Sequence, residues 1–545
     1  MITSDTATSQ VDRDLQAQLT SAHDSPSSIA GAATIISIGN LSSRIVGLFR
    51  EVAKSFYFGN GIMASAFQLA ANPPSQFYDL LIGGMLNSAL VPTFSGLVSD
   101  RARDERLADF GRLLGALIGL VSLFLLVLVG LLWIFASGLA AVLAGGPDQD
   151  LPLVATLLRI TIPAIIFMNL SGILTAALYA RRKFAFTAFT ATVYNLSMIV
   201  CVVLLERRLS VSALAVGMLL GSVLQVLMQL PGLRGIPIRL SLNWHHPGVG
   251  QIIRLFLPVA GGLALAQLAA LVSYVLAGHI GAEGPATMSY AAQVIQFPLG
   301  MIVVAVSSAI LPALSMHGGQ ASHESFKNTL AQGLRLVWVL IMPASIGLFV
   351  LAQPVVALLF QRGAFTPAST TYTALALRAA VPQLIFAAID QPLINAFYAQ
   401  RDTRTPTVIG VLSTVSYLVL LGVLYTLSTR GLREFTLTDL ILANSLKTGL
   451  DACLMSFFLL RKIGGLRGFD IAGLGLKVCA ASVLMGLVVW WVMALIQDHV
   501  GSAQFTSNAL TAIIAAVAGL GVYLVCLTVL RVRELTLLRG LLRRA

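Results

Sequence analysis

Four charged residues lie within an otherwise apolar stretch near the start of the chain: Arg44, Arg50, Glu51 and Lys54. A charged side chain at the centre of a bilayer costs about 2.5–3.5 kcal/mol on insertion scales, so each one requires a reason. Guanidinium groups match phosphate oxygens with two parallel hydrogen bonds, and Arg50 and Lys54 would repel each other with nothing between them. The pattern predicts a site for an anionic headgroup. The alternative is an internal ion pair through Glu51, with Lys54 extending to the membrane interface.

The composition of the chain is that of a membrane protein. Of its 545 residues, 57% are hydrophobic and 11% are charged, whereas charged residues make up about 25% of soluble domains. In hydrocarbon, backbone groups must pair within their own segment, so long apolar runs predict helices. The net charge of +12 is spread over short basic clusters between these runs, which argues against a nucleic-acid partner.

The apolar runs predict about fourteen transmembrane helices, each long enough to cross the roughly 30 Å hydrocarbon layer. They lie at residues 30–56, 62–97, 110–144, 151–180, 184–205, 210–231, 250–278, 285–316, 327–360, 368–399, 406–428, 437–461, 471–497 and 507–531. Kinks or breaks are expected where prolines interrupt a run, because proline removes a helical hydrogen bond. These positions are Asn72–Pro74, Pro298, Pro312, Pro382 and Pro392.

Sequence repeats indicate an internal duplication. Residues 158–186 share their pattern with residues 377–405 at an offset of 219, and Leu90-Val91-Pro92 matches Ile310-Leu311-Pro312 at an offset of 220. Six spans, an even number, separate the copies, so the copies should have the same orientation, a repeat pattern typical of transporters with a central substrate site.

The predicted fold class is therefore an all-α polytopic membrane protein with two parallel six-helix lobes and a C-terminal helix pair. The expected segments are a disordered cytoplasmic tail (1–28), the first lobe (29–231), a cytoplasmic linker (232–249), the second lobe (250–462) and the last two spans with a basic C-terminus (463–545). Lys and Arg follow even-numbered spans far more often than odd-numbered ones, which places both termini in the cytoplasm.

Other charges in the spans suggest supporting roles. Asp79 could pair with one of the arginines of the first span, and Asp390 could couple an ion to transport. Lys447 and Asp451, spaced i,i+4, form either an intrahelical salt bridge or part of the same ion-coupling site. The chain has no G-x-x-x-x-G-K-[ST] loop, no H-E-x-x-H or zinc-type spacing and no G-x-S-x-G elbow, so we expect no enzyme activity, no cofactor and no metal site.

Several motifs resemble the MurJ/MviN family of the MOP exporter superfamily. The first-helix signature is present as Ser43-Arg44-Ile45-Val46-Gly47-Leu48-x-Arg50-Glu51. Similar matches follow in order along the chain at Leu90-Val91-Pro92, Asn195-Leu196-Ser197-Met198, Gln229-Leu230-Pro231, Phe297-Pro298-x-Gly300, Leu359-Phe360-x-x-Gly363 and Phe397-Tyr398-Ala399.

The resemblance implies a flippase that carries a polyprenyl-diphosphate-linked glycan, above all peptidoglycan lipid II, between membrane leaflets by alternating access. Spans 13 and 14 would help to form a groove for the lipid tail. Arg44 and Arg50 match arginines of the family. Ser65, in contrast, stands where the family has an acidic residue, and Asp79 and Gln293 stand where it has arginines. The implied substrate-binding residues are Arg44, Arg50, Glu51, Ser65, Asp79 and Gln293.

Two other functions stay open at this point. One is a divergent exporter of another lipid-linked oligosaccharide or of an amphipathic compound, and the other is a non-transporting scaffold for cell-wall synthesis proteins. The expected partners are the lipid-linked substrate, membrane lipids, a monovalent ion and cell-wall synthesis proteins. The expected location is the bacterial inner membrane.

Overall fold

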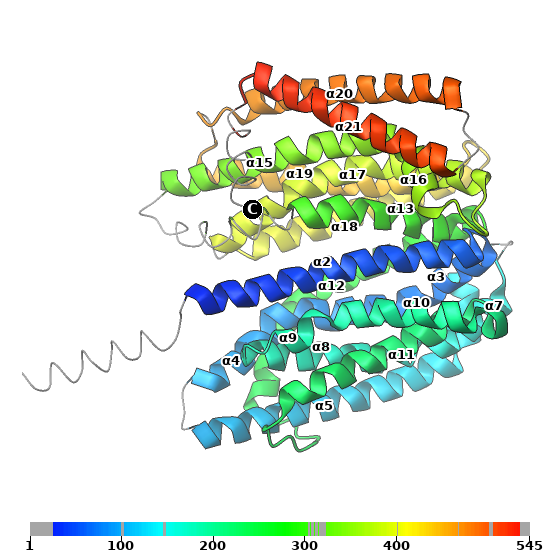
Figure 1. Ribbon diagram of the computed structural model, residues 1–545. Helices are drawn as coiled ribbons and strands as arrows, with labels where there is room; N and C mark the ends of the chain where they lie inside the picture. The colour runs from blue at the N-terminus through cyan, green and yellow to red at the C-terminus, as the bar shows by residue number, and fades with distance from the viewer. Residues whose placement is uncertain are drawn as a thin grey trace, which may run out of the picture.

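The computed structural model of the chain is a bundle of long helices that run roughly side by side (Figure 1). The structure describes residues 26–99, 103–144, 146, 149–303, 306, 310, 314, 323–400, 402–466, 468–500, 505–532 and 534. Within these residues there is no β-strand. The all-α fold class is therefore confirmed, as expected for a chain whose backbone groups must pair inside lipid.

The helices follow the predicted spans closely. The first half contains α2 (Pro26–Phe58), α3 (Ile62–Tyr78), α4 (Val91–Ser99), α5 (Arg103–Ile134), α6 (Ala136–Leu143), α7 (Leu151–Thr161), α8 (Ala164–Ala180), α9 (Ala185–Ala188), α10 (Thr190–Leu209) and α11 (Ser212–Gln229). The second half contains α12 (Pro247–Ile280), α13 (Gly284–Pro298), α15 (His323–Val350), α16 (Ala352–Phe360), α17 (Pro367–Ala399), α18 (Arg404–Thr429) and α19 (Leu437–Ile463), and the chain continues with α20 (Ile471–Val500) and α21 (Phe505–Val529).

Eleven helical segments among the described residues are long and apolar enough to cross a membrane. The predicted number of fourteen is not confirmed, because α2, α19 and the segment that begins with α13 are not among the eleven. Two of these, α2 and α19, have 33 and 27 residues. They carry the charged residues discussed below, which lower their apolar character.

Large apolar side chains face outward on many of the helices. Leu476 on α20 and Phe135 beside α5 are 74% and 65% exposed. In water such a surface would be unfavourable, because exposed apolar area costs about 25 cal/mol per Å². Lipid tails remove this cost, so the outward-facing residues fit a bundle surrounded by a bilayer.

Two short π-helices occupy equivalent positions in the two halves. The first, η1 (Asp79–Gly83), follows α3, and the other, η4 (Leu299–Val303), follows α13. Their starts differ by 220 residues (299 − 79), the offset at which the sequence repeats. A further π-helix, η2 (Leu86–Leu90), lies before α4.

The predicted kinks are confirmed only in part. The helix α3 continues through Pro73 and Pro74, and α17 continues through Pro382 and Pro392. The expected breaks are therefore absent at these prolines, and the first half leaves α-geometry only after residue 78, at the end of α3. At Pro298, α13 does give way to η4 as expected, whereas Pro312 lies outside the described residues. Pro163 and Pro382 occupy equivalent positions in the two copies of the sequence repeat. Pro163 separates α7 from α8, whereas Pro382 does not interrupt α17.

The two halves lie on opposite sides of α2 and α12 in Figure 1. On one side are α5, α8, α10 and α11, and on the other are α15 and α17 to α21. Helices pack mainly with partners of their own half, for example α10 with α11 and α17 with α19. The first helix, α2, also contacts α13 of the second half, so its charges lie where the halves meet.

Candidate functional site

Arg44 projects from α2 onto the start of the π-helix η4. Its Nη1 donates a hydrogen bond to the backbone oxygen of Gln296 at 3.0 Å. The guanidinium lies so close to Gly300 that a Cβ there would be 2.0 Å from Cζ of Arg44. Gly300 therefore provides the space that the guanidinium occupies, which explains the glycine in the Phe297-Pro298-x-Gly300 motif.

A cavity of about 150 Å³ opens beside Arg44. It is lined by Arg44, Gln296, Leu299, Gly300, Ala387, Asp390 and Gln391. Asp390 of α17 is 9% exposed, and its Oδ1 has no hydrogen-bond partner. Among the described residues, no ion pair joins Arg44 to Asp390 or to any other carboxylate. An arginine with donors to spare therefore faces a space inside the helix bundle.

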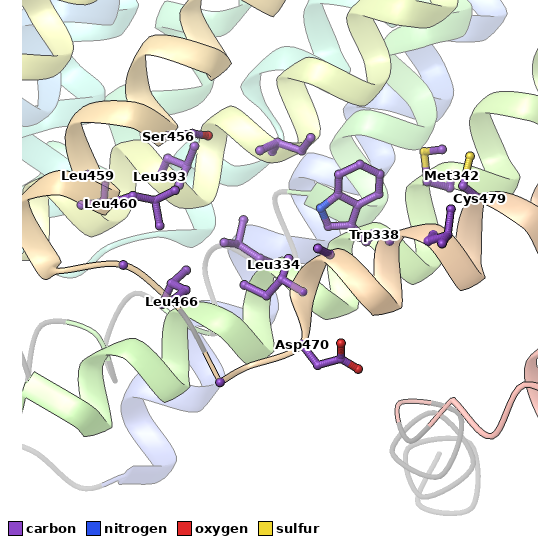
Figure 2. A pocket seen from close by; sticks show the side chains of 17 residues that line it. Leu334, Trp338, Met342, Leu393, Ser456, Leu459, Leu460, Leu466, Asp470 and Cys479 are labelled. Atoms are coloured by element: carbon purple, nitrogen blue, oxygen red, sulfur yellow. The ribbon is translucent and has the colours of Figure 1, made fainter.

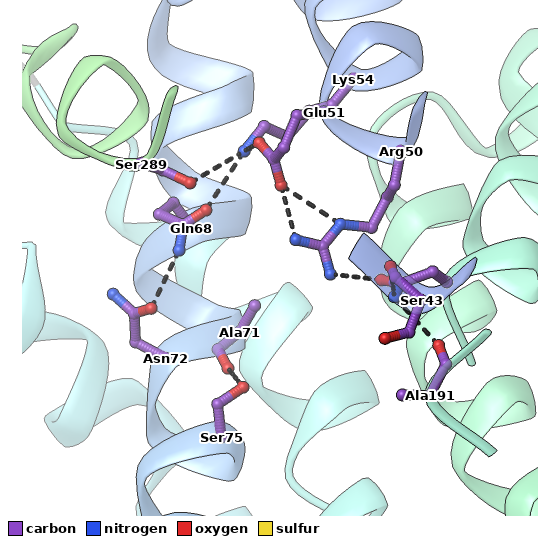
Figure 3. Close-up of polar contacts among 11 residues, drawn as sticks. Ser43, Arg50, Glu51, Lys54, Gln68, Ala71, Asn72, Ser75, Ala191 and Ser289 are labelled. Atoms are coloured by element: carbon purple, nitrogen blue, oxygen red, sulfur yellow. Dashed lines mark hydrogen bonds and ion pairs between the residues drawn. The ribbon is translucent and has the colours of Figure 1, made fainter. Parts of the chain in front are cut away.

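Arg50, one turn and a half further along α2, has a different environment (Figure 3). Its Nη2 and Nε donate to Oε1 of Glu51 at 2.7 and 3.2 Å, and its Nη1 donates to Oδ1 of Asn195 at 2.9 Å. The other oxygen of Glu51, Oε2, lies 2.5 Å from Nζ of Lys54. Glu51 thus forms ion pairs with both cations. This is the internal ion pair that the sequence suggests as the alternative to a site for an anionic headgroup.

Lys54 does not extend to the membrane interface. Its side chain is 2% exposed, and Nζ donates to Gln68 on α3 at 3.2 Å and to Ser289 on α13 at 3.4 Å. The ammonium also lies 4.5 Å from the ring centre of Tyr290, a favourable cation–π distance. The predicted position of Lys54 was wrong because the buried partners outweigh the advantage of hydration at the interface.

Hydrogen bonds to backbone carbonyls hold the end of α2 against the second half. The hydroxyl of Tyr290 donates to the carbonyl of Gly59 at 2.6 Å, and the amide of Ala364 donates to the carbonyl of Phe56 at 2.8 Å. A Cβ on Gly363 would lie 2.2 Å from the carbonyl oxygen of Phe56, and Gly363 has a φ of +59°. Only glycine fits this position, which accounts for the Leu359-Phe360-x-x-Gly363 motif.

Two predicted site residues belong to the interface between α2, α3 and α13. Ser65 is completely buried, and its hydroxyl accepts a hydrogen bond from the amide of Ala286 at 3.3 Å. Gln293 is partly buried on α13, and its side-chain nitrogen lies against Gly47 of α2. Gln293 is therefore close to the arginines of α2, whereas Ser65 faces the closed contact between the halves.

Asp79 lies apart from this group. It is exposed and is the first residue of η1. Within the described part of the chain it forms no ion pair with Arg44 or Arg50. The expected pairing is therefore wrong, because Glu51 is adjacent to Arg50 and occupies it instead.

The charges of α19 are arranged differently from the expectation. Asp451 accepts a hydrogen bond from the hydroxyl of Ser413 on α18 at 2.9 Å, and Nζ of Lys447 lies 5.9 Å from the ring centre of Tyr417. No ion pair links Lys447 to Asp451 in the described structure. The i,i+4 salt bridge was wrong, since each side chain finds a partner on α18.

Some residues around the site were not recognised as such from the sequence. Asn195 was part of a matched motif but not of the expected site, and its Oδ1 accepts from Arg50. Gln296 and Gln391 line the cavity beside Arg44. The spacing of Gln293 and Gln296, three residues apart on one helix face, was the available signal.

Comparison with known proteins identifies the family. The family model described as "Lipid II flippase MurJ" matches residues 54–510. The chain belongs to the MurJ family. A "Probable lipid II flippase MurJ" of Vibrio cholerae serotype O1 is 32% identical over 398 residues, which cover 71% of this chain and 75% of that protein. One of Haemophilus influenzae is 29% identical over 479 residues, covering 83% of this chain and 90% of that protein.

Solved structures agree in fold. A structure titled "Lipid II flippase MurJ, inward closed conformation" has a TM-score of 0.76 at 22% identity, covering 92% of this chain and all of that one. An inward-facing multidrug resistance MATE family transporter of the MOP superfamily has a TM-score of 0.64 at 14% identity, covering 79% and 98%. The family and the apolar helices indicate a multi-pass protein of the bacterial inner membrane.

This MurJ family member also has large apolar cavities beside its last two helices. A cavity of about 980 Å³ lies between α15, α19 and α20, and its lining includes Trp338 and Met342 of α15 and Cys479 of α20 (Figure 2). Asp470 marks its edge, next to the loop that precedes α20. A second cavity of about 480 Å³ lies between α15 and α21, and Tyr523 contributes to its wall. Such walls suit a hydrocarbon chain.

Proposed function

We propose that this MurJ family member is a flippase that moves a polyprenyl-diphosphate-linked glycan, above all peptidoglycan lipid II, from the cytoplasmic to the outer leaflet. The observation that carries the proposal is Arg44, a guanidinium inside the bundle that faces a cavity and has no ion-pair partner among the described residues. Arg44 is half-buried in a membrane-spanning helix, where a charge without a partner is costly. A diphosphate headgroup would supply the partner that this arginine lacks.

The two parts of the cargo would use different surfaces. Arg44 would bind the diphosphate through charge-assisted hydrogen bonds, which are worth about 1.5–3 kcal/mol each. The polyprenyl tail would lie against the apolar walls between α15, α20 and α21. This division agrees with a ligand whose head is anionic and whose tail is hydrocarbon.

The remaining predicted substrate residues would act when the halves separate. Ser65 is engaged in the closed contact between α2, α3 and α13, and Glu51, which also holds Arg50, is engaged there through Lys54. Opening that contact would free their polar groups for the headgroup on the outer side. Asp79 and Gln293, which replace family charges, would then shape the preference for the glycan.

Alternating access would separate the lobe of residues 29–231 from that of residues 250–462, joined by the linker 232–249, with residues 463–545 beside the second lobe. With both termini in the cytoplasm, the end of α2 at Phe58 faces outward. The contacts of Gly59 with Tyr290 and of Phe56 with Ala364 would then close the outer side. The structure would correspond to a state open or occluded toward the cytoplasm.

Asp390, Lys447 and Asp451 would couple a monovalent cation or a proton to this cycle. The unpartnered oxygen of Asp390 lies in the same cavity as Arg44. Asp451 and Ser413 provide further oxygen atoms on neighbouring helices. We propose no catalytic step and no cofactor for this protein.

The test is complementation of a bacterial strain depleted of its own lipid II flippase. Wild type should restore growth, Arg44→Ala should not, and Arg44→Lys should do so partly, because lysine keeps the charge but loses the planar fork. Arg159→Ala is the matched control, because Arg159 is an exposed arginine at the end of α7 that bonds only Ser137 among the described residues. Full growth with Arg44→Ala would refute the proposed role and favour a scaffold that recruits cell-wall synthesis proteins.

A second candidate function keeps the fold and changes the cargo. Asp79 and Gln293 stand where the resemblance places arginines, so the cavity has fewer cations for a diphosphate than the family pattern implies. That observation favours a divergent exporter of another lipid-linked oligosaccharide or amphipathic compound. Flipping of lipid II by the protein in liposomes, measured against an undecaprenyl diphosphate with a different glycan, separates the two.

A further inference from the structure

Arg335 of α15 joins two segments of the chain at one edge of the large apolar cavity between α15, α19 and α20. Its Nε lies 2.6 Å from Oε1 of Glu534, which follows α21, and its Nη1 donates to the carbonyl of Phe469 at 3.2 Å. Its sequence neighbour Leu334 lines the cavity, and so does Asp470 in the segment that precedes α20 (Figure 2). The guanidinium therefore lies beside the apolar space and holds the segments that precede α20 and follow α21.

Glu534 is an incompletely satisfied partner for this arginine. A turn after α21 leads to it, in which the amide of Val532 donates to the carbonyl of Leu527 at 3.0 Å and Arg531 has a φ of +52°. Glu534 is 7% exposed, and its second carboxylate oxygen, Oε2, is buried without a hydrogen-bond partner. A buried acceptor without a donor costs free energy. Another anion whose oxygens are better satisfied can therefore replace Glu534.

Two cations of α15 flank the segment between α19 and α20. Lys327 lies eight residues before Arg335 (335 − 327), about 12 Å along the helix. A Cβ on Gly464, at the end of α19, would lie 3.7 Å from its Nζ. Lys327 forms no ion pair among the described residues. Asp470, the charged residue in the cavity lining, lies over the first turn of α20, because a Cβ on Gly473 would be 2.2 Å from its Oδ1. The edge thus presents two cations, and Glu534 occupies one of them.

We propose that Glu534 is a built-in competitor for the headgroup of the cargo: the polyprenyl tail enters the large cavity, and the diphosphate replaces the Glu534 carboxylate on Arg335. The inference rests on the proposed function and adds a second docking site for the same cargo, apart from Arg44. A guanidinium binds phosphate oxygens through two parallel hydrogen bonds, and the apolar walls beside it suit the hydrocarbon tail. The exchange would release the segment that follows α21.

The place and size of the site fit a polyprenyl diphosphate. Glu534 follows the last helix, so with both termini in the cytoplasm, as proposed above, this edge faces the leaflet from which flipping starts. The cavity volume of about 980 Å³ is near the upper limit of ligand pockets, about 1,000 Å³. A long isoprenoid chain needs more such space than one acyl chain of a phospholipid. The occupant is therefore the polyprenyl diphosphate and not a phospholipid.

The experiment measures the affinity of the full-length protein for undecaprenyl diphosphate, by calorimetry in detergent micelles. Glu534→Gln keeps the shape of the side chain and removes the competing charge, so the affinity should rise about tenfold, the lower end for one charge-assisted hydrogen bond. An ion pair that only stabilises the fold would give an unchanged or weaker affinity. The same titrations with undecaprenol, which has the same tail and no charge, and with phosphatidylglycerol should show no gain.

Further variants locate the gain at Arg335. Arg335→Gln should lower the affinity about tenfold, and adding it to Glu534→Gln should abolish the gain. Arg44→Ala should leave the gain in place, because Arg44 lines a different cavity. Asp109→Asn is the matched control, because Asp109 is a carboxylate that pairs with Arg112 on α5, in the first half. Its affinity should equal that of wild type.

The outcomes separate the inference from the proposed function. Wild type that binds undecaprenyl diphosphate with no gain in Glu534→Gln, or a gain that survives Arg335→Gln, overturns the exchange and leaves the flippase proposal standing. An equal gain for phosphatidylglycerol overturns the assignment of the occupant. Wild type that binds no undecaprenyl diphosphate refutes the proposed function itself. If Glu534→Gln fails to fold, Glu534→Asp decides, because a shorter carboxylate weakens the contact with Arg335 and should raise the affinity; an unchanged affinity overturns the exchange.

Discussion

The two arginines of α2 are only six residues apart, and their environments differ completely. Arg50 donates hydrogen bonds to Glu51 and Asn195, whereas Arg44 donates one hydrogen bond to a backbone oxygen and faces a cavity. Both are half-buried charges in a helix of a membrane protein. Arg50 is compensated by neighbouring side chains, and Arg44 makes no ion pair among the described residues.

The comparison shows that the presence of a charge in a span does not by itself indicate a ligand site. The group of Arg50, Glu51 and Lys54 ties α2 to α3, α10 and α13. Its members satisfy one another, so it stabilises one arrangement of the halves. Arg44 makes one hydrogen bond and no ion pair among the described residues, so we expect added negative charge in the cavity beside it to be favourable. Four predictions test this distinction.

The largest effect is expected from Glu51→Gln. The change leaves Arg50 and Lys54 as buried cations without a carboxylate between them, and breaking such a pair costs about 3–5 kcal/mol. Unfolding of the purified protein by denaturant in detergent should show a loss of this size. If the free energy of unfolding of the variant lies within about 1 kcal/mol of the wild-type value, the group of Arg50, Glu51 and Lys54 is not what holds α2 in place.

Arg44→Ala should affect diphosphate binding far more than stability. It removes one hydrogen bond to Gln296 from a partly exposed side chain, so the free energy of unfolding should change by less than about 1 kcal/mol. Binding of undecaprenyl diphosphate should weaken by about 10- to 100-fold, the equivalent of one lost charge-assisted bond. A large loss of stability with unchanged binding would reverse the roles of the two arginines.

Gly300→Ala tests the position of Arg44 without removing its charge. The new methyl group would occupy the space of the guanidinium, but the end of an arginine side chain can move. We expect a cost of about 1 kcal/mol in diphosphate binding, near the lower end for overpacking. Gly130→Ala on α5 is the control, because a Cβ there meets nothing within 4 Å. Equal effects of both changes would mean that the close approach at Gly300 has no role.

The smallest effect concerns an ion pair outside the spans, Asp402 with Lys462 at 2.6 Å. Burial would raise the pKa of Asp402, but hydrogen bonds from Lys462 and Thr405 outweigh it and lower the pKa. The pair therefore adds stability above about pH 4, and this contribution is lost as the pH falls through the pKa of the folded state. Asp402→Asn should cost less than about 1 kcal/mol at pH 7 and should reduce the acid sensitivity of thermal unfolding. An effect as large as that of Glu51→Gln would show that burial is not what separates the two pairs.

The helices could be predicted from the sequence because hydrocarbon leaves the backbone no alternative. The ends of α12, α17 and α19 lie within three residues of the predicted spans. Arg44 and Arg50 were visible as candidates for a related reason, since charges stand out in apolar runs. Their difference was not visible, because it depends on which side chains of α10 and α13 reach them.

The wrong predictions share a physical cause. Spacing along one helix identified Lys447 and Asp451 as neighbours, but Ser413 and Tyr417 of α18 compete for them. Proline identified candidate breaks in α3 and α17, but both helices continue through these residues. Local patterns define which contacts are available, and neighbouring helices decide which are made.

The matching π-helices have a consequence for how the halves can rearrange. A π turn contains one residue more than an α turn needs. Shedding that residue would rotate the rest of the helix by roughly 100°, the angle between successive residues. The segments Asp79–Gly83 and Leu299–Val303 differ in sequence and yet share this surplus. Each half thus contains one such turn. The turn of the second half lies on the cavity wall, where loss of the extra residue would turn Gly300 away from Arg44 without breaking the helix.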